Sequence, residues 1–197
     1  MKPLFALYIL RIQKFSRRVP QAAAALLASV CFTVSTGCAP SIHDAIARGN
    51  INAVHKLLNE NPDLVNARDG KQKTPLHCAV TYKQREVMEL LIEKGAAIGA
   101  RDITGMTPLH VAAMLGRRDE AELLLQHGAD PTVTDDYGDM PIHTAAVFGH
   151  GQIIGLLVHS GMSPDIPNGN GQVPEEIARQ YRQDRVVSYI RHLENKS

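Results

Sequence analysis

The sequence predicts an all-α solenoid in which one helix-turn-helix unit is repeated along the chain. Three independent sets of residues recur with the same period of 33 positions, namely prolines, glycines and acidic or amide residues. They are Pro75, Pro108, Pro141 and Pro174; Gly95, Gly128 and Gly161; and Asp69, Asp102, Asp135 and Asn168. A period of about 20 to 50 residues is typical of architectures in which each repeat buries its apolar face against its neighbours.

Each unit begins with a helix whose start is marked by a short motif. Thr-Pro-Leu-His occupies residues 74–77 and 107–110, and related residues occupy 140–143 and 173–176. The threonine can accept hydrogen bonds from the N–H groups at the helix start, and proline in the first turn removes no needed donor. Four positions after the proline there is an alanine, which lets stacked helices approach closely. These alanines, with the equivalent residue of an earlier unit, are Ala45, Ala79, Ala112, Ala145 and Ala178.

The second helix of each unit carries the large apolar residues of the expected core. One set consists of Leu57, Leu91, Leu124, Leu157 and Ile190, and beside it lie Val54, Met88, Ala121, Ile154 and Val187. The recurring glycine follows this helix, at a position where a left-handed residue typically ends a helix. Because Met140 and Val173 replace the threonine of the motif, we expect the later units to be less stable than the earlier ones.

These motifs resemble the ankyrin repeat, whose specific marks are Thr-Pro-Leu-His, the paired alanines at 112–113 and 145–146, and Gly-Ala-Asp at 128–130. The resemblance covers residues 41–196 and implies five units joined by short β-turn fingers, with a variant first unit and a degenerate last unit acting as caps. The units are residues 41–69, 70–102, 103–135, 136–168 and 169–196.

Residues 1–37 have the composition of a secretory signal, which is removed and is not part of the fold. Basic residues precede a short, weakly apolar stretch at 21–34, and small residues follow it. Residues 35–38, Ser-Thr-Gly-Cys, resemble the lipobox of bacterial lipoproteins, which implies that Cys38 becomes the lipidated N-terminus. Lipoproteins usually have Leu where this chain has Ser35. A plain cleaved signal is the alternative, and an uncleaved membrane anchor is the second choice.

Lipid on Cys38 implies an anchor in a bacterial cell envelope membrane, with the protein facing the periplasm and residues 38–40 as a short tether. Ala39, in place of Asp, resembles the class sorted to the outer membrane, which is therefore favoured over the inner membrane. Without lipid the domain would be soluble in the periplasm or secreted. Cys78 would then be able to pair with Cys38; otherwise it is the one remaining thiol and the domain is held by packing alone.

The composition of the chain excludes several functional classes. With 44% apolar and 21% charged residues, it is neither a disordered polymer nor a polytopic membrane protein. Its net charge of +1 arises because all five charged residues in 1–37 are basic; the remainder carries 16 basic and 20 acidic residues. Such a mildly acidic body lacks the basic surface typical of nucleic-acid binding, so we expect no nucleic-acid partner.

The residues that could carry chemistry have structural explanations. His77, His110 and His143 are equivalent residues of successive units, about 8–10 Å apart, which is too far for shared zinc coordination. We expect each to bond the backbone of the adjacent turn, and we expect His150 to be solvated at a helix end. Four aspartates near one turn lack the EF-hand spacing of a calcium site. The sequence has no metalloprotease, phosphate-loop or nucleophile-elbow motif, so we expect no enzyme activity, cofactor, metal or small-molecule substrate.

The resemblance implies a protein partner that binds in a concave groove, lined by the ends of the first helices and by the finger tips. Equivalent positions form an apolar set in a chain poor in aromatic residues. The predicted groove residues are Tyr82, Ile103, Met106, Met114, Leu115, Tyr137, Val147, Phe148 and Tyr181. An exposed apolar ladder of this kind is typical of a partner site; burial between helices is the alternative.

Two functions are compatible with this pattern. The first is an envelope-anchored binding module that mediates protein–protein interaction, with an inhibitor or immunity-type role as one form of it. The second is a structural or accessory envelope protein that protects an assembly without tight, specific binding. Fold alone does not identify the partner.

Overall fold

The structure, a computed structural model, describes residues 41–194 of the chain. The expected signal segment, Cys38 and the tether lie outside the described residues. Those described form ten α-helices and one 3₁₀ helix, with no strand. The α-helices are α3 (Ile42–Ala47), α4 (Ile51–Glu60), α5 (Pro75–Thr81), α6 (Arg85–Glu93), α7 (Pro108–Leu115), α8 (Arg118–Gln126), α9 (Pro141–Phe148), α10 (Gly151–His159), α11 (Pro174–Gln180) and α12 (Asp184–Glu194).

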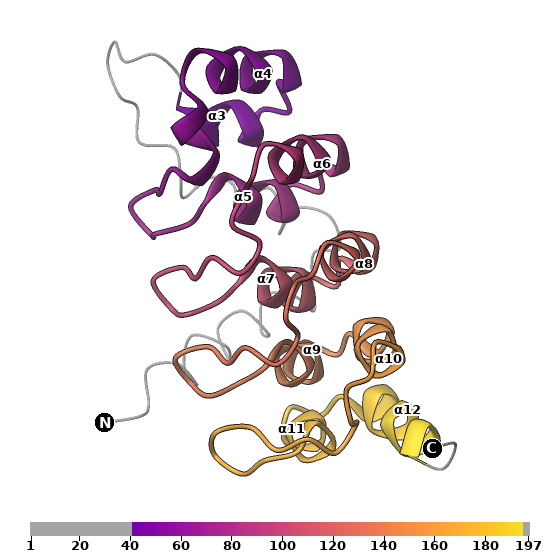
Figure 1. The fold of residues 1–197 in the computed structure, drawn as a ribbon. Helices are drawn as coiled ribbons and strands as arrows, with labels where there is room; N and C mark the ends of the chain where they lie inside the picture. Colours follow the sequence, from indigo (N-terminus) through magenta and orange to yellow (C-terminus); the bar gives the residue numbers. More distant parts are fainter. Residues whose placement is uncertain (1–40, 195–197) are drawn as a thin grey trace, which may run out of the picture. The chain divides into compact units, whose positions relative to one another are not determined.

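The helices form five consecutive pairs that stack in chain order (Figure 1). Within the described residues, the first helices of the pairs, α3, α5, α7, α9 and α11, form one layer. The second helices, α4, α6, α8, α10 and α12, form the other layer. Before α5, α7, α9 and α11, the chain makes a turn that projects away from both layers; we call these turns the fingers of units 2 to 5. The predicted all-α solenoid of about five helix pairs is confirmed.

The start of each first helix follows the predicted chemistry. Thr74 and Thr107 stand directly before α5 and α7 in extended conformation, and proline is the first helical residue in both. The Thr107 hydroxyl accepts a hydrogen bond from the His110 N–H at 3.4 Å, which satisfies a donor that the helix itself leaves unpaired. Met140 and Val173 hold the same backbone conformation without a hydroxyl.

The alanine and apolar positions build one continuous core between the layers. All five predicted alanines are at most 2% exposed, and Leu91, Leu124, Leu157 and Ile190 are fully buried. Leu57 differs, because it is half-buried while its neighbour Leu58 is 3% exposed. A 3₁₀ helix, η2 (Pro62–Asn66), packs against α4. This element includes Pro62, near which one extra residue sets Ala45 and Leu57 34 positions, rather than 33, before Ala79 and Leu91. The sequence did not predict the 3₁₀ helix.

Left-handed residues follow both helices in units 2, 3 and 4. Gly95, Gly128 and Gly161 have φ of 87°, 86° and 101°, as predicted for the end of the second helix. Gly116 and Gly149, with φ of 66° and 80°, do the same after the first helices α7 and α9. Glycine adopts this conformation without the steric cost that a Cβ adds.

Candidate functional site

The fingers are shaped by one side chain at a repeated position. Oδ1 of Asp135 accepts hydrogen bonds from the N–H groups of Tyr137 at 2.9 Å and Asp139 at 3.0 Å. Asp102 and Asp69 make the same two contacts in units 3 and 2, and the amide oxygen of Asn168 makes them in unit 5. An acceptor at this position closes the turn on itself and holds the residues at the tip in a fixed orientation.

Neighbouring fingers are joined through their backbones. The Ile103 N–H donates to the Lys71 carbonyl at 3.0 Å, and the Asp136 N–H donates to the Thr104 carbonyl at 3.1 Å. Arg101 adds an ion pair to Asp136 at 3.1 Å. The fingers of units 2, 3 and 4 therefore form one wall rather than three separate turns.

The motif histidines tie each finger to the helix of the preceding unit. Nδ1 of His110 accepts from the Thr107 N–H at 3.2 Å, so the ring proton is on Nε2, which donates to the Asp139 carbonyl at 3.0 Å. His77 bonds the Met106 carbonyl in the same way, whereas His143 bonds the Ile166 carbonyl, which lies six residues before the equivalent position, Gln172. Burial lowers the pKa of all three rings, and that of His110 falls to about 4. The predicted structural role of these histidines is confirmed, since both ring nitrogens of each histidine form hydrogen bonds with backbone groups.

The predicted groove residues differ in exposure. Among the described residues, the exposed large apolar side chains are Ile103, at 62%, and Tyr137, at 44%, both in fingers. Val147 is only 7% exposed, because it packs into the core, so its side chain contributes no groove surface. The other predicted groove residues are half-buried: Tyr82, Met106, Met114, Leu115, Phe148 and Tyr181.

Two observations place the finger bases beside the ends of the first helices. In unit 5, the Gln172 amide donates to the Gln180 side chain at 3.3 Å. Gln172 and Gln180 are the equivalents, two units on, of Met106 and Met114. In addition, burial raises the pKa of Tyr181, and the Asp139 carboxylate raises it further, so the unit 4 finger and the end of α11 are close in space. Residues from fingers and from first helices therefore face a common surface.

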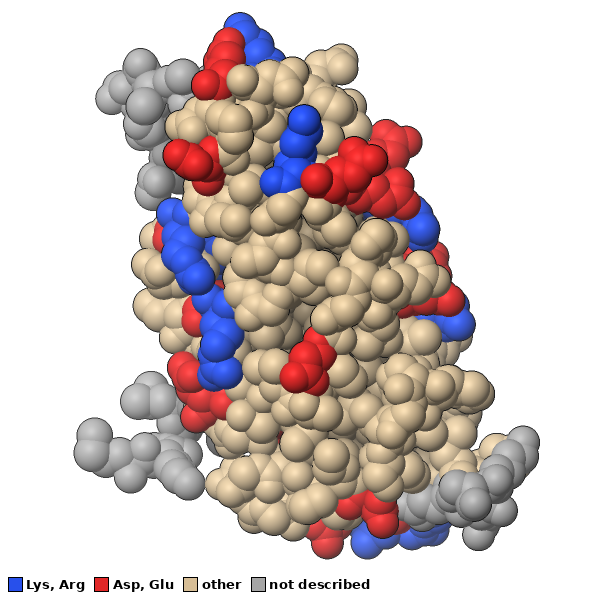
Figure 2. All heavy atoms as spheres, in the orientation of Figure 1, with Lys and Arg blue, Asp and Glu red and all other residues tan. Residues whose placement is uncertain are grey.

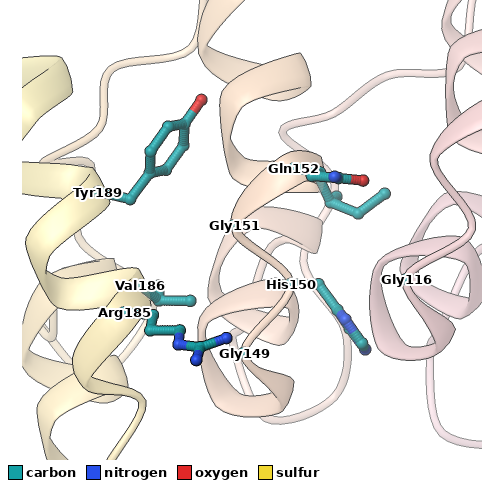
Figure 3. Close-up of a pocket in the computed structure, with 9 residues that line it drawn as sticks. Gly116, Gly149, His150, Gly151, Gln152, Arg185, Val186 and Tyr189 are labelled. Atoms are coloured by element: carbon teal, nitrogen blue, oxygen red, sulfur yellow. The ribbon is translucent and has the colours of Figure 1, made fainter.

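A second concave surface lies where the first and second helices of units 3 to 5 are connected (Figure 3). It encloses about 480 Å³. Its lining residues are Gly116, Gly149, His150, Gly151, Gln152, Ile153, Arg185, Val186 and Tyr189. Sequence analysis did not predict this hollow. It arises because α10 has glycine at 151, where α6 and α8 begin with arginine.

The expectation that His150 is solvated at a helix end is wrong. Its Nε2 lies 3.1 Å from the Met114 carbonyl of the preceding unit, and the ring is half-buried beside Gly116. Burial lowers its pKa. Gln183, the equivalent residue of unit 5, donates to the Val147 carbonyl at 3.1 Å. The ring of His150 therefore links two units. The sequence carried a signal for this role, because glutamine, which can donate the same hydrogen bond, stands at the equivalent position 183.

In residues 41–194, no group of three or more His, Cys, Asp and Glu side chains is arranged to hold a metal ion. No helix of that same part of the chain has the length and apolar character needed to cross a bilayer.

Comparison with known proteins agrees with the geometry. Residues 42–135 match a family described as ankyrin repeats, in three copies. These residues are ankyrin repeats. A stretch of 51 residues is 41% identical to a Caenorhabditis elegans protein described as a transient receptor potential cation channel subfamily A member 1 homolog. That stretch is 26% of this chain and covers 4% of the C. elegans protein.

The ankyrin fold continues beyond residue 135. Helices α9 to α12 form two more pairs of the same kind, and His143 bonds the Ile166 carbonyl in the connection that leads to α11. Ankyrin repeats are typically scaffolds for protein–protein interaction and imply a protein partner. Both exposed large apolar side chains belong to the fingers, which project away from the two helix layers (Figure 1).

Proposed function

We propose that these ankyrin repeats bind one protein partner through the groove formed by the fingers and the ends of the first helices. The observation that carries the proposal is the exposure of Ile103 and Tyr137, at 62% and 44%, on neighbouring fingers. Large apolar side chains on a rigid surface are typical of contact sites, and aromatic residues commonly dominate the binding energy of such sites. The domain acts by binding and not as an enzyme.

The half-buried first-helix residues extend this surface. Leu115 and Phe148 end α7 and α9 at equivalent positions, and each keeps part of its side chain accessible. A partner side chain that covers both of them and the finger tips would bury a continuous apolar strip. Complete removal from water would stabilise the complex by roughly 25 cal/mol per Å² of apolar surface before the cost of association.

The test is substitution in the groove with a matched substitution elsewhere. Leu115→Glu and Phe148→Glu are expected to abolish cross-linked capture of the partner from envelope fractions while helical circular dichroism and melting change little. Leu125→Glu is the control, because Leu125 is also half-buried but lies on the second helix α8. If the groove variants still capture the partner and the control does not, the site is on the outer face and the proposal is wrong. Unfolding of a groove variant would show that its residue is core.

The location that we propose is a bacterial envelope membrane, with lipid on Cys38 and the repeats facing the periplasm. Support comes from the basic and then weakly apolar order of residues 1–37 and from the small residues before the cysteine. Two acyl chains hold a protein at a membrane far more stably than one. Ala39 after the cysteine favours the outer membrane.

Fractionation tests the anchor. Cys38→Ser is expected to move the protein from the membrane fraction to the soluble periplasmic fraction, whereas Cys31→Ser, inside the signal, leaves it on the membrane. A wild-type protein that is already soluble in the periplasm or in the medium would overturn the anchor and leave the groove proposal intact.

An inhibitor or immunity-type role is the specific form of binding that suits a small anchored module. Its alternative is an accessory protein that protects an envelope assembly without tight binding. Adding the purified chain to the captured partner separates them: stoichiometric loss of the partner's activity supports inhibition. Unchanged activity together with weak association supports the accessory role.

A further inference from the structure

The fingers that border the groove carry opposite charges at its two ends. The unit 2 finger, residues 68–73, has three basic residues and one acid, a net charge of +2. The unit 3 finger, residues 101–106, has one of each sign. The unit 4 finger, residues 134–139, has three aspartates and no basic residue, a net charge of −3, and residues 167–172 of unit 5 carry no charge. On the finger side of Figure 2, Lys and Arg side chains lie at the level of the upper fingers and acidic side chains follow below.

The charge of the unit 4 finger is only partly compensated within the protein. Arg101 pairs with Asp136, but both side chains are about half exposed, at 45% and 57%, so solvent weakens this pair. Burial, together with the nearby carboxylates of Asp139 and Asp136, raises the pKa of Asp135 to about 6. The backbone N–H groups that Asp135 binds do not restore an ordinary pKa. The finger therefore presents net negative charge to whatever approaches it.

One apolar tip lies between the basic and the acidic finger, and the other lies within the acidic finger. Ile103 is in the neutral finger, and Tyr137 stands in the acidic finger between Asp136 and Asp139. Moving along the stack from unit 2, a bound segment would meet lysines 71 and 73, then the apolar surface, then the aspartates. Because opposite charges attract and juxtaposed like charges are costly, such an order selects both the sequence and the direction of a partner segment.

We infer that the groove binds a bipolar segment of its partner, with acidic residues against Lys71 and Lys73, apolar residues against Ile103 and Tyr137, and basic residues against Asp136 and Asp139. This inference rests on the proposed function and adds the chemistry and the orientation of the partner. A uniformly acidic segment is repelled by the unit 4 finger, and a uniformly basic one is repelled by the unit 2 finger. Neither of these uniformly charged segments can pair favourably with both charged fingers.

Three synthetic peptides of about 14 residues test the inference, each with the same Leu- and Phe-containing centre. The first has glutamates at one end and lysines at the other, the second has glutamates at both ends and the third has lysines at both. Binding to the full chain in non-ionic detergent is measured by fluorescence anisotropy at low salt, where surface charges are least screened. The bipolar peptide is expected to bind about threefold tighter than either uniform peptide for each matched charge.

Orientation is measured with a photo-cross-linker at the lysine end of the bipolar peptide. The cross-links are expected within residues 134–139. In the double variant Lys71→Glu with Asp136→Lys, which changes the net charges of the two fingers from +2 and −3 to 0 and −1, the fraction of cross-links within residues 134–139 is expected to fall. The control double variant, Lys94→Glu with Asp119→Lys, makes the same charge changes at exposed sites directly after α6 and on α8. It should leave affinity and cross-links unchanged.

The outcomes separate this inference from the proposed function. Equal affinity for all three peptides, or cross-links that ignore the charge swap, overturns the bipolar inference. If Leu115→Glu still abolishes peptide binding in that case, the groove remains the binding site. If Leu115→Glu and Tyr137→Ser leave both peptide binding and partner capture unchanged, the proposed function itself is wrong.

Discussion

Tyr189 of α12 lies across Gly155 of α10, so close that a Cβ at residue 155 would be 3.2 Å from Cζ of its ring. Gly155 is buried, and the ring is half-buried over it. The equivalent residues of α6 and α8 are Glu89 and Glu122, each paired with an arginine four residues earlier. In unit 4, the contact with Tyr189 replaces this surface ion pair and binds the last unit to the stack.

A double-mutant cycle is expected to reveal this contact. In the Tyr189→Ala background, Gly155→Ala should stabilise the protein by about 1 kcal/mol, because alanine favours the helix more than glycine. In the wild-type background the ring must move, so this gain should be lost or reversed. Gly151→Ala is the control, since its Cβ would meet Tyr189 at an ordinary 3.5 Å. Additive effects in urea unfolding would show that ring and glycine do not interact energetically.

The ends of the first helices give a second prediction. Lys83 and Arg182 have φ of 57° and 58° at the positions where Gly116 and Gly149 stand in units 3 and 4. A side chain in the left-handed region costs about 1–2 kcal/mol, part of which is offset because glycine is more flexible in the unfolded chain. Lys83→Gly and Arg182→Gly are each expected to raise the free energy of unfolding by about 0.5–1 kcal/mol.

Lys94 provides the control for these changes. It also follows a helix, but its φ is −80°, which suits any residue. Lys94→Gly should therefore lower the free energy of unfolding by about 0.5 kcal/mol. Gly116→Ala should lower it more, since a Cβ there would be 2.6 Å from the ring of His150. A stabilised Lys94→Gly variant would mean that the gain at Lys83 is not due to its left-handed backbone.

Much of this architecture follows from local rules about which residues start and end helices, and these residues can be recognised in the sequence. Proline at residue 108 and glycine at residue 128 mark a helix start and a helix end wherever they recur, so the five units and their core alanines were predictable. The exposure of individual side chains in the groove was less predictable. Met114, Val147 and Gln180 are equivalent residues, yet they are half-buried, buried and exposed. Exposure at this position depends on the side chains of adjacent units, which a periodic pattern does not specify.

Contacts between units could not be predicted for the same reason, namely that a periodic pattern does not specify which side chains of adjacent units meet. The bond from His150 to the Met114 carbonyl and the packing of Tyr189 on Gly155 each join residues more than 30 positions apart. Each uses a residue type that its equivalents in other units lack. The repeat pattern predicts what the units share, whereas the residue types that make these contacts change from unit to unit.

The missing threonine of unit 4 gives a third prediction. Met140 keeps the N–H contact to His143 at 3.2 Å, but it has no hydroxyl to match Thr107, whose Oγ1 lies 2.9 Å from the ring nitrogen Nδ1 of His110. Met140→Thr is expected to stabilise the protein by about 1 kcal/mol and to slow amide exchange in α9. Met140→Val, which has the shape of threonine without the hydroxyl, should not do so. Hydrogen exchange in the wild type is expected to show residues 140–194 opening before residues 70–128.

Asp135 gives a prediction about the acidic finger. Burial raises its pKa to about 6, so ionising it in the folded protein at pH 7 is unfavourable. Asn168 makes the same two backbone contacts in unit 5 without a charge. Asp135→Asn is therefore expected to stabilise the protein at pH 7 by on the order of 1 kcal/mol, with solvent screening of this partly exposed group taken into account. Asp130→Asn, at an exposed turn, is the control and should give no gain. Equal stability of Asp135→Asn and wild type would show that the burial has no energetic cost.

The motif histidines predict how stability depends on pH. Burial lowers the pKa of His77, His110 and His143 below the ordinary 6.5, to about 4 for His110. Between those values the unfolded chain binds protons that the folded chain does not, so stability is complete above pH 6.5 and falls as the pH drops. His110 alone contributes a loss of about 3 kcal/mol by pH 4. Asp135 acts in the opposite direction below pH 6, because its raised pKa favours proton uptake by the folded state.

Urea unfolding at pH 7, 6 and 5 measures how steeply the free energy of unfolding depends on pH. His110→Gln should lower stability at pH 7 and flatten the slope, because glutamine does not titrate. His127→Gln, at an exposed residue after α8, should leave the slope unchanged. If His110→Gln keeps the wild-type slope, protonation of this ring does not oppose folding.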